Sequence, residues 1–380
     1  MTQQRPIPQF AVIPGAQVHS VLSGNEKHTL DLVAATYRVH GEGATVNPPS
    51  YFLRFPDRPS SRIIALPASV GGDTPVDGIK WISSFPENVA SGLPRASAVL
   101  VLNDPATGYP IACLESSIIS AARTAASAAL AADLLCAGRP RPRRVGFIGT
   151  GLIARHIHTY LARTGWEFDE VGVHDLSAEH AAGFRAYLER ADPERSDPQR
   201  PDAERPTPEG AGPADTGEAG AGAAPRITVH ASAEELVRSS DLVVLATVAA
   251  APHVTEPSWF SHNPVVLNVS LRDLAPEVLL ASANVLDDVE HCLKADTSPH
   301  LTEQLTGNRD FVDGTLHEVM AGRVAVPTDR PVVFSPFGLG VLDLAVGRFV
   351  YDELAARGEL AVVEGFFHEL DRYGRNTRQP

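Results

Sequence analysis

The stretch Arg144-Val-Gly-Phe-Ile-Gly-Thr-Gly-Leu-Ile-Ala154 decides the fold of this chain. It begins with an apolar run typical of a buried strand and continues through a glycine turn into the start of a helix. Gly149 permits the tight turn, Gly151 lets the backbone approach a phosphate, and the small Ala154 allows the helix to pack closely on the strand. The N-terminus of the helix offers free N–H groups to an anion. The sequence therefore predicts a dinucleotide-binding βαβ unit.

An acidic residue at a suitable distance refines this prediction. Asp175 directly follows the apolar run Glu170–His174. A carboxylate at the end of the second strand accepts hydrogen bonds from ribose hydroxyls and repels a 2′-phosphate, so we expect NAD rather than NADP. The alternative is a glycine-rich turn without a ligand, but the combination of strand, turn, helix, strand and acid favours nucleotide binding.

The alternation of strands and helices continues toward the C-terminus. Continuous apolar runs at Leu242–Thr247 and Val265–Val269 indicate strands that are buried on both faces of a parallel sheet. Residues 192–225 interrupt this series with Pro, Gly, Ala, Asp and Glu. This composition predicts a disordered insertion within the nucleotide-binding unit.

The chain before the glycine turn has a different pattern. Residues 1–110 alternate short β-like runs with turns, which predicts a mixed or antiparallel sheet. The alanine-rich, glycine-free run from Glu115 to Leu135 predicts a buried helix. Another helix is expected at Leu342–Arg357, where the chain returns to the first domain. A length of 380 residues fits two domains.

Composition argues against several classes of partner. The formal net charge of −14 argues against nucleic acid or an anionic membrane as a partner. Three cysteines without paired spacing predict reduced thiols and a cytoplasmic location. The most apolar stretch, Ile118–Leu135, carries Arg123 and Asp133 and is expected to be a buried helix rather than a membrane span. The fourteen histidines show no metal-ligand spacing, so no metal is expected.

Three cations are candidates for a substrate site, because nicotinamide transfers the hydride and the protein has to hold the substrate. Lys80 lies in an otherwise apolar run, and Arg123 lies within the alanine-rich helix. The side chain of each cation is either exposed to solvent or buried, where it would bind a carboxylate. Arg54 has the alternating pattern of a strand, and an arginine in such a pattern is more often solvated.

Asp273 is the candidate acid or base. It follows the apolar run Val265–Val269, and open α/β sheets place catalytic groups at the carboxyl ends of their strands. The alternative is a helix cap, since Pro276 fits a helix start just beyond it. Thr247 and Ser270 follow neighbouring strands and are expected to line the nicotinamide half of the cleft.

Several motifs match one family in the same order. This chain resembles the ornithine cyclodeaminase/mu-crystallin family at Gly78-Ile-Lys-Trp81, Leu102-Asn-Asp-Pro-Ala-Thr-Gly-Tyr-Pro-Ile111, Glu115-Ser-Ser117, Arg123-Thr-Ala-Ala126 and Ile148-Gly-Thr-Gly151. The likeness extends from about residue 45 to 345, except for the 192–225 insertion. It implies an α/β fold in which a Rossmann NAD-binding domain, residues 126–319, is inserted in a mixed α/β substrate-binding and dimerisation domain, residues 1–125 and 320–380. It also implies a homodimer.

The resemblance also implies residue roles. It makes Lys80 and Asp273 catalytic. The implied substrate-binding residues are Arg54, Lys80, Ser97 and Arg123. The implied NAD-binding residues are Thr124, Gly149, Thr150, Gly151, Leu152, Ile153, Asp175, Thr247, Val248 and Ser270.

One branch of the family is especially similar. The runs Arg62-Ile-Ile-Ala-Leu-Pro-Ala-Ser-Val-Gly-Gly72 and Arg95-Ala-Ser97 resemble the N-(2-amino-2-carboxyethyl)-L-glutamate dehydrogenases, which supply 2,3-diaminopropionate for siderophores and peptide antibiotics. True ornithine cyclodeaminases carry a Gly-Gly-Asp-Cys-Pro-like segment where this chain has Ser270-Leu-Arg-Asp273. The resemblance implies NAD-dependent oxidative hydrolysis of that amino acid, made by a PLP-dependent synthase. The alternatives are an ornithine cyclodeaminase, a ketimine or amino-acid reductase, and a non-catalytic crystallin-like ligand-binding protein.

Overall fold

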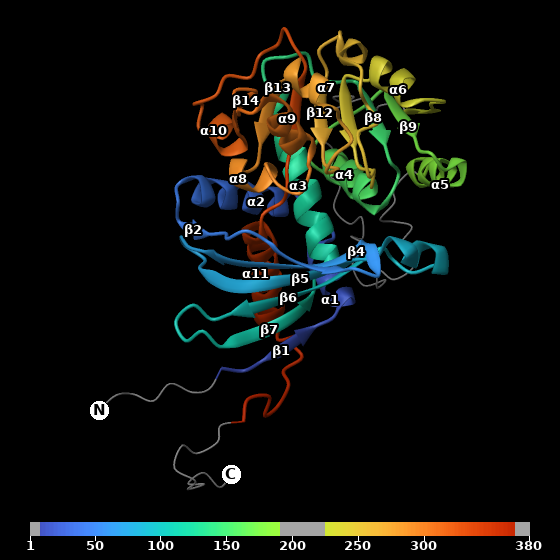
Figure 1. Ribbon diagram of the computed structural model, residues 1–380. Helices are drawn as coiled ribbons and strands as arrows, with labels where there is room; N and C mark the ends of the chain where they lie inside the picture. Colours follow the sequence, from blue (N-terminus) through green and yellow to red (C-terminus); the bar gives the residue numbers. More distant parts are fainter. Residues whose placement is uncertain (1–7, 191–224, 369–380) are drawn as a thin grey trace, which may run out of the picture.

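The computed structural model describes residues 8–190 and 225–368 of the chain. These residues form two β-sheets, and helix α3 (Ser117–Leu135) extends from one sheet to the other (Figure 1). All but the last residue of the insertion expected at 192–225 lies outside the described ranges.

The first sheet is mainly antiparallel, as the pattern before the glycine turn predicts. Its strands are β1 (Ala11–Ile13), β2 (Thr45–Val46), β3 (Tyr51–Phe55), β4 (Arg58–Val70), β5 (Val76–Ser84), β6 (Ala96–Asn103) and β7 (Pro110–Glu115). Their order is β1-β7-β6-β5-β4-β2, with β3 also paired to β4 and β1 parallel to β7. Helix α11 (Gly340–Arg357) packs on β4, β5 and β6.

The expectation of short β-like runs throughout residues 1–110 is wrong for residues 15–41. This segment forms α1 (Gly15–Leu22) and α2 (Glu26–Gly41), and a short 3-10 helix, η1 (Pro86–Ser91), follows β5. Leu30, Val33 and Tyr37 of α2 are buried at helical spacing. The apolar residues of this segment thus recur with the period of a helix and not with that of a strand.

The second sheet is entirely parallel and has the predicted Rossmann architecture. Its strands are β8 (Arg144–Ile148), β9 (Glu170–His174), β10 (Arg226–Val229), β11 (Leu242–Leu245), β12 (Val265–Asn268), β13 (Ala283–Leu286), β14 (Val312–Thr315) and β15 (Val332–Ser335). The order β10-β9-β8-β11-β12-β15-β13-β14 changes direction between β8 and β11, which is where open α/β sheets bind ligands. Its helices are α4 (Leu152–Arg163), α5 (Ala178–Leu188), α6 (Ala233–Ser239), η3 (Pro257–Phe260), α7 (Pro276–Leu280), α8 (Val289–Cys292), α9 (Ser298–Thr306) and α10 (Leu316–Met320).

Strand β15 extends the second sheet beyond the expected domain end at residue 319. It pairs with β12 and β13, and its residues Val332, Val333 and Phe334 are fully buried like those of the neighbouring strands. Helix α11 follows directly and packs on the first sheet. The structure therefore places the return to the first sheet after Ser335.

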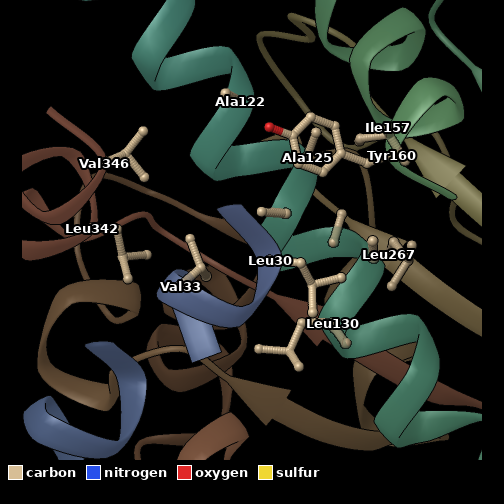
Figure 2. Packing of buried hydrophobic residues seen from close by; sticks show 14 of the residues in the cluster. Leu30, Val33, Ala122, Ala125, Leu130, Ile157, Tyr160, Leu267, Leu342 and Val346 are labelled. Carbon is tan, nitrogen blue, oxygen red and sulfur yellow. The ribbon is translucent and has the colours of Figure 1, made fainter. Parts of the chain in front are cut away.

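One hydrophobic cluster joins the two units around α3 (Figure 2). It includes Leu30 and Val33 of α2, Ala122, Ala125 and Leu130 of α3, Ile157 and Tyr160 of α4, Leu267 of β12, and Leu342 and Val346 of α11. By length and composition α3 is apolar enough to cross a membrane, but most of it is buried inside the protein. It is the buried core helix that the sequence predicts, and its alanines let α2 and α4 pack closely against it.

Candidate active site

The glycine turn after β8 is shaped to receive a phosphate. Gly149 has a φ of +83°, and a Cβ there would lie 2.7 Å from the carbonyl oxygen of Ala246. Gly151 is the N-cap of α4, receives no side-chain capping bond, and has no atom near the position of a Cβ. The first N–H groups of α4 are therefore open to an anion, and the turn fits the pyrophosphate of a dinucleotide.

Asp175 follows β9 and closes this turn. Its carboxylate accepts hydrogen bonds from the backbone N–H of Thr150 at 3.0 Å, from the hydroxyl of Thr150 at 2.8 Å, and from the N–H of Ser177 at 2.9 Å. Burial raises the pKa of Asp175, but the hydrogen bonds from Ser177 and Thr150 outweigh it, so the pKa lies below its usual value. The acid is therefore ionised at neutral pH and could accept hydrogen bonds from the hydroxyl groups of a ribose.

Apolar side chains are exposed near this turn. Leu152, at the start of α4, and Val248, after β11, are largely exposed, and Leu176 beside Asp175 is fully exposed. Leu152 and Val248 are among the predicted site residues, whereas Leu176 is not. An exposed leucine beside this acid could contact a flat apolar group.

A buried cluster of two cations and one carboxylate lies between β5, α3 and α11. Lys80 Nζ donates to Asp343 Oδ2 at 2.6 Å, and Arg123 Nε donates to Asp343 Oδ1 at 3.3 Å. The side-chain exposures of Lys80, Arg123 and Asp343 are 2%, 12% and 0%. Ser120 accepts weaker hydrogen bonds from both cations. Neither cation is an exposed point, because both side chains are largely buried and bind a carboxylate of the chain itself.

The electrostatics of this cluster leave room for another anion. Two cations share one carboxylate, so the cluster carries an excess positive charge in a place poorly reached by water. Burial lowers the pKa of Lys80 to about 8, although the charge of Asp343 opposes this and that of Arg123 adds to it. Asp343 lies in the first turn of α11, where the helix dipole favours its negative charge. Asp343 is not among the residues predicted for the site, because its segment was expected only to be a helix.

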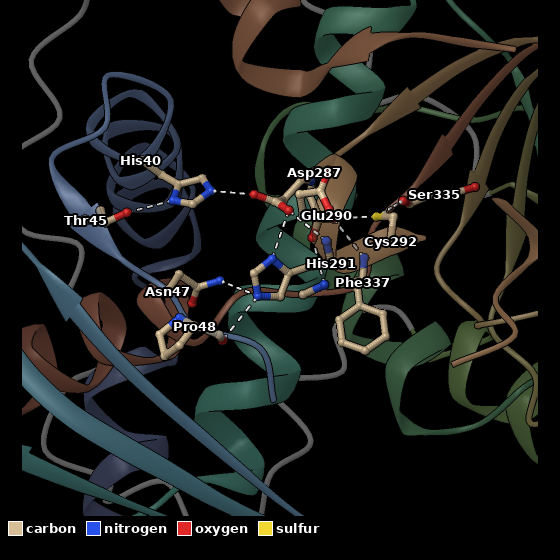
Figure 3. Close-up of polar contacts among 12 residues, drawn as sticks. His40, Thr45, Asn47, Pro48, Asp287, Glu290, His291, Cys292, Ser335 and Phe337 are labelled. Carbon is tan, nitrogen blue, oxygen red and sulfur yellow. Dashed lines mark hydrogen bonds and ion pairs between the residues drawn. The ribbon is translucent and has the colours of Figure 1, made fainter. Parts of the chain in front are cut away.

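A glycine loop holds Arg123 in position. Gly338 has a φ of +89°, and a Cβ there would lie 2.4 Å from Nη1 of Arg123. The loop is fixed by Asp287, which accepts hydrogen bonds from the N–H groups of Phe337 at 2.9 Å and Gly338 at 2.7 Å (Figure 3). Asp287 thus acts on Arg123 through the loop.

Asp273 lies at the carboxyl edge of the second sheet and is fully buried. Its Oδ1 accepts a 2.6 Å hydrogen bond from Thr247, while Oδ2 receives no hydrogen bond from the described residues. His253, which is more exposed, places Nε2 3.6 Å from that free oxygen. Helix α7 begins after Ala275, which is its N-cap, so the helix-cap alternative for Asp273 is wrong. A buried carboxylate with one free oxygen is suited to accept a proton.

The other predicted site residues occupy varied positions. Arg54 is exposed on β3 and stacks on Phe52. Ser97 pairs with Ser83 on the face of the first sheet opposite Lys80, so the structure does not bring it to this cluster. Three further residues, Thr124 on α3, Ile153 on α4 and Ser270 after β12, are half-buried or buried around the central edge of the second sheet.

A second polar network links the two units (Figure 3). His40 at the end of α2 donates from Nε2 to the carboxylate of Asp288 at 3.1 Å, and His291 contacts Asp288 at 2.9 Å and Asn47 at 3.0 Å. Burial opposes the charge of His291, but Asp288 outweighs it and raises the pKa of His291. This network joins α8 to the segment before β3. Among the described residues, no group of histidines, cysteines and acids could hold a metal ion.

The fold, the glycine turn and comparisons with known proteins define the class of protein as the NAD-dependent dehydrogenases and reductases of amino acids. Residues 16–196 match the model of the ornithine cyclodeaminase/mu-crystallin family, and the predicted relationship to this family is confirmed. The chain is 27% identical over 333 residues to N-((2S)-2-amino-2-carboxyethyl)-L-glutamate dehydrogenase of Staphylococcus aureus, covering 85% of this chain and 89% of that one.

Two further similarities extend over most of the chain. Alanine dehydrogenase of Archaeoglobus fulgidus is 26% identical over 354 residues, covering 91% of this chain and 95% of that one. An archaeal alanine dehydrogenase dimer with bound NAD superimposes with a TM-score of 0.75 at 24% identity, covering 94% of this chain and 100% of that chain. These comparisons confirm the predicted α/β fold with a Rossmann domain. The relatives are amino-acid dehydrogenases, as predicted for this chain, and the archaeal structure contains the predicted cofactor, NAD.

Proposed function

We propose that this protein oxidises N-(2-amino-2-carboxyethyl)-L-glutamate with NAD⁺ and water, giving L-2,3-diaminopropionate, 2-oxoglutarate, NADH and a proton. The observation that carries this proposal is the buried cluster in which Lys80 and Arg123 share the single carboxylate of Asp343. Its excess positive charge suits a carboxylate of an amino-acid substrate. The similarity to the dehydrogenase of Staphylococcus aureus supports the choice of amine.

NAD fits the edge of the second sheet. Its pyrophosphate would lie on the Gly149–Gly151 turn at the N-terminus of α4, and its ribose would lie at Asp175. When bound there, NAD⁺ supplies an acceptor for the hydride from the glutamyl Cα. Thr247 and Ser270, which follow β11 and β12, are expected to lie on the nicotinamide side.

Residues of the chain bind the substrate and transfer protons. Arg123 and Lys80 hold a substrate carboxylate and so orient the carbon that is oxidised. Loss of hydride from that carbon leaves a C=N bond, to which water adds. The free Oδ2 of Asp273 accepts the proton of the amine or of the attacking water. Cleavage of the C–N bond of the resulting carbinolamine then releases 2,3-diaminopropionate and 2-oxoglutarate.

The test is incubation of the full-length protein with this amino acid and NAD⁺. We expect a rise in absorbance at 340 nm with equal formation of 2-oxoglutarate, and loss of at least about 10²-fold in rate for Asp273→Asn. The comparison substrates are ornithine and alanine, each with NAD⁺, and the imine pyrroline-2-carboxylate with NADH. Release of proline and ammonia from ornithine, or turnover confined to alanine or the imine, would overturn the proposal.

The same proposal includes the assembly and the pathway. We infer a cytoplasmic homodimer formed through the first sheet, whose outer face carries the cross-strand row Tyr51, Trp81 and Val99. All three side chains are more than 40% exposed. The domain that contains this sheet would bind substrate and dimerise, while a PLP-dependent synthase would supply the substrate for a siderophore or antibiotic pathway.

A further inference from the structure

Three arginines meet at one end of the first sheet. Arg54 on β3 lies directly opposite Arg62 on β4, and Arg62 lies directly opposite Ser84 on β5. Arg95, just before β6, donates from Nη1 to the hydroxyl of Ser84 at 2.8 Å. Directly opposed residues share a face of a sheet, so these arginines converge on the same side.

A fourth arginine reaches the group from the second unit. Arg272 directly precedes Asp273, and its Nη2 donates to the carbonyl oxygen of Ala295 at 3.0 Å. The pKa of Arg62 is lowered first by burial and then by the positive charges of Arg95, Arg272 and Arg54, so these three charges lie close enough to act on Arg62. The arginines therefore lie where the first sheet faces the loop that carries Asp273.

This arginine group has no counter-charge of its own. None of the four forms an ion pair with a carboxylate of the described residues, and Arg62, Arg95 and Arg272 are all partly buried. Half-buried guanidinium groups that repel one another are costly unless an anion joins them. The group therefore has the charge, the partial burial and the access of an anion site.

The arginine group and the Lys80 cluster lie along one face of the first sheet. Lys80 and Ser84 are both on β5 and are separated by an even number of residues, so their side chains point to the same side. Four residues of strand span about 13 Å. One small carboxylate cannot contact both places, so a substrate that uses both must carry at least two carboxylates.

We propose that Arg62 and Arg95, with Arg54 and Arg272 beside them, form a second anion site that binds the distal carboxylate of a polycarboxylate amino acid. This inference rests on the proposed function and deepens it, because the γ-carboxylate of the glutamyl group is the natural occupant. The site selects against substrates with one carboxylate, such as alanine or proline, which leave the arginines without an anion.

Binding of simple ligands tests the site independently of turnover. Glutarate and butyrate differ in the second carboxylate, and their affinities for the full-length protein are measured by calorimetry with and without NADH. We expect glutarate to bind at least about tenfold more tightly than butyrate, and Arg62→Gln or Arg95→Gln to abolish this difference. Arg58→Gln is the matched control, since Arg58 is exposed on the same strand beside Asp57. Equal affinities in the wild type, or equal losses in Arg58→Gln, would overturn the proposal.

Kinetics separate this inference from the proposed function. For N-(2-amino-2-carboxyethyl)-L-glutamate, Arg62→Gln should raise KM at least about tenfold with little change in kcat. For the corresponding L-glutamine compound, whose γ-group is uncharged, the same variant should change KM little. Arg62→Lys, which keeps a positive charge, should restore part of the affinity. If neither amine is oxidised, the proposed function fails, while the glutarate measurement still decides whether the anion site exists.

Discussion

At the scale of single residues, Asp343 sets the charge of the cluster that it forms with Lys80 and Arg123. It lies 263 residues from Lys80 in sequence and yet accepts a 2.6 Å hydrogen bond from it. Lys80, Arg123 and Asp273 could be predicted from their unusual surroundings in the sequence and from the family resemblance. Asp343 could not, because an acid in the first turn of a helix is common and nothing local marks its partner. Long-range pairing of this kind follows only from the packed fold.

The first prediction concerns Gly338. Gly338→Ala should lower kcat/KM at least about tenfold, because its Cβ would displace the guanidinium of Arg123. Gly358→Ala is the matched control, since Gly358 also has a positive φ but no atom within 4 Å of a Cβ. Both variants should lose about 1 kcal/mol of stability from the left-handed backbone. Equal kcat/KM values for the two variants would contradict the role of the loop.

The second prediction concerns the protonation of Lys80. Its pKa is lowered to about 8, so the amine is charged below that pH and neutral above it. If the charged form binds a substrate carboxylate, KM should rise about tenfold per pH unit above pH 8, with kcat changing less. Lys80→Arg stays charged and should flatten this dependence. An unchanged pH profile in that variant would show that another group is responsible.

At the scale of elements, the apolar runs predicted the parallel strands well. Val145–Ile148, Glu170–His174 and Leu242–Leu245 are strands in the structure because continuous apolar runs suit a sheet covered on both faces. The helices at residues 15–41 were missed, since polar residues break their apolar stripe into short runs. Strand β15 lies in the segment 320–380 that was assigned to the first domain, because a sequence does not show which sheet a strand joins.

The third prediction concerns the turn between β8 and α4. Gly149→Ala should weaken NAD binding at least about tenfold, because its Cβ would press on the backbone at Ala246 and shift the turn. Gly165→Ala, also at a positive φ but with open space around a Cβ, should bind NAD like the wild type. Titration of NADH fluorescence measures both. If Gly149→Ala bound NADH as tightly as the wild type, the dinucleotide would not bind at this turn.

At the scale of the whole molecule, two units meet around one helix, and the candidate site draws on both. Lys80 comes from the first sheet, Arg123 from α3 and Asp273 from the second sheet. The sequence predicted two domains and the central position of the Rossmann unit. It could not predict that Arg272 would face Arg62, because that approach depends on how the units pack.

The fourth prediction concerns assembly. Trp81→Glu should convert the proposed dimer to a monomer, because it places a charge within the exposed apolar row of the first sheet. Leu305→Glu on α9 is the control, since Leu305 is exposed on the other unit. Light scattering after size-exclusion chromatography measures the mass of each. A monomeric wild type, or dissociation of both variants, would contradict an interface at this face.

Helix α3 carries Arg123 and Thr124 on one turn and continues into the Rossmann unit, where it contacts α4. Each residue of an α-helix advances the chain by about 100° of rotation and 1.5 Å of rise. Deleting one residue after Thr124 would therefore turn the substrate side away from the nucleotide side by more than a quarter of a circle. In the proposed site, the helix sets the rotation of the substrate side relative to the nucleotide side. We therefore expect adaptation to substrates of other sizes to come from the side chains at its edges and not from a change in its length.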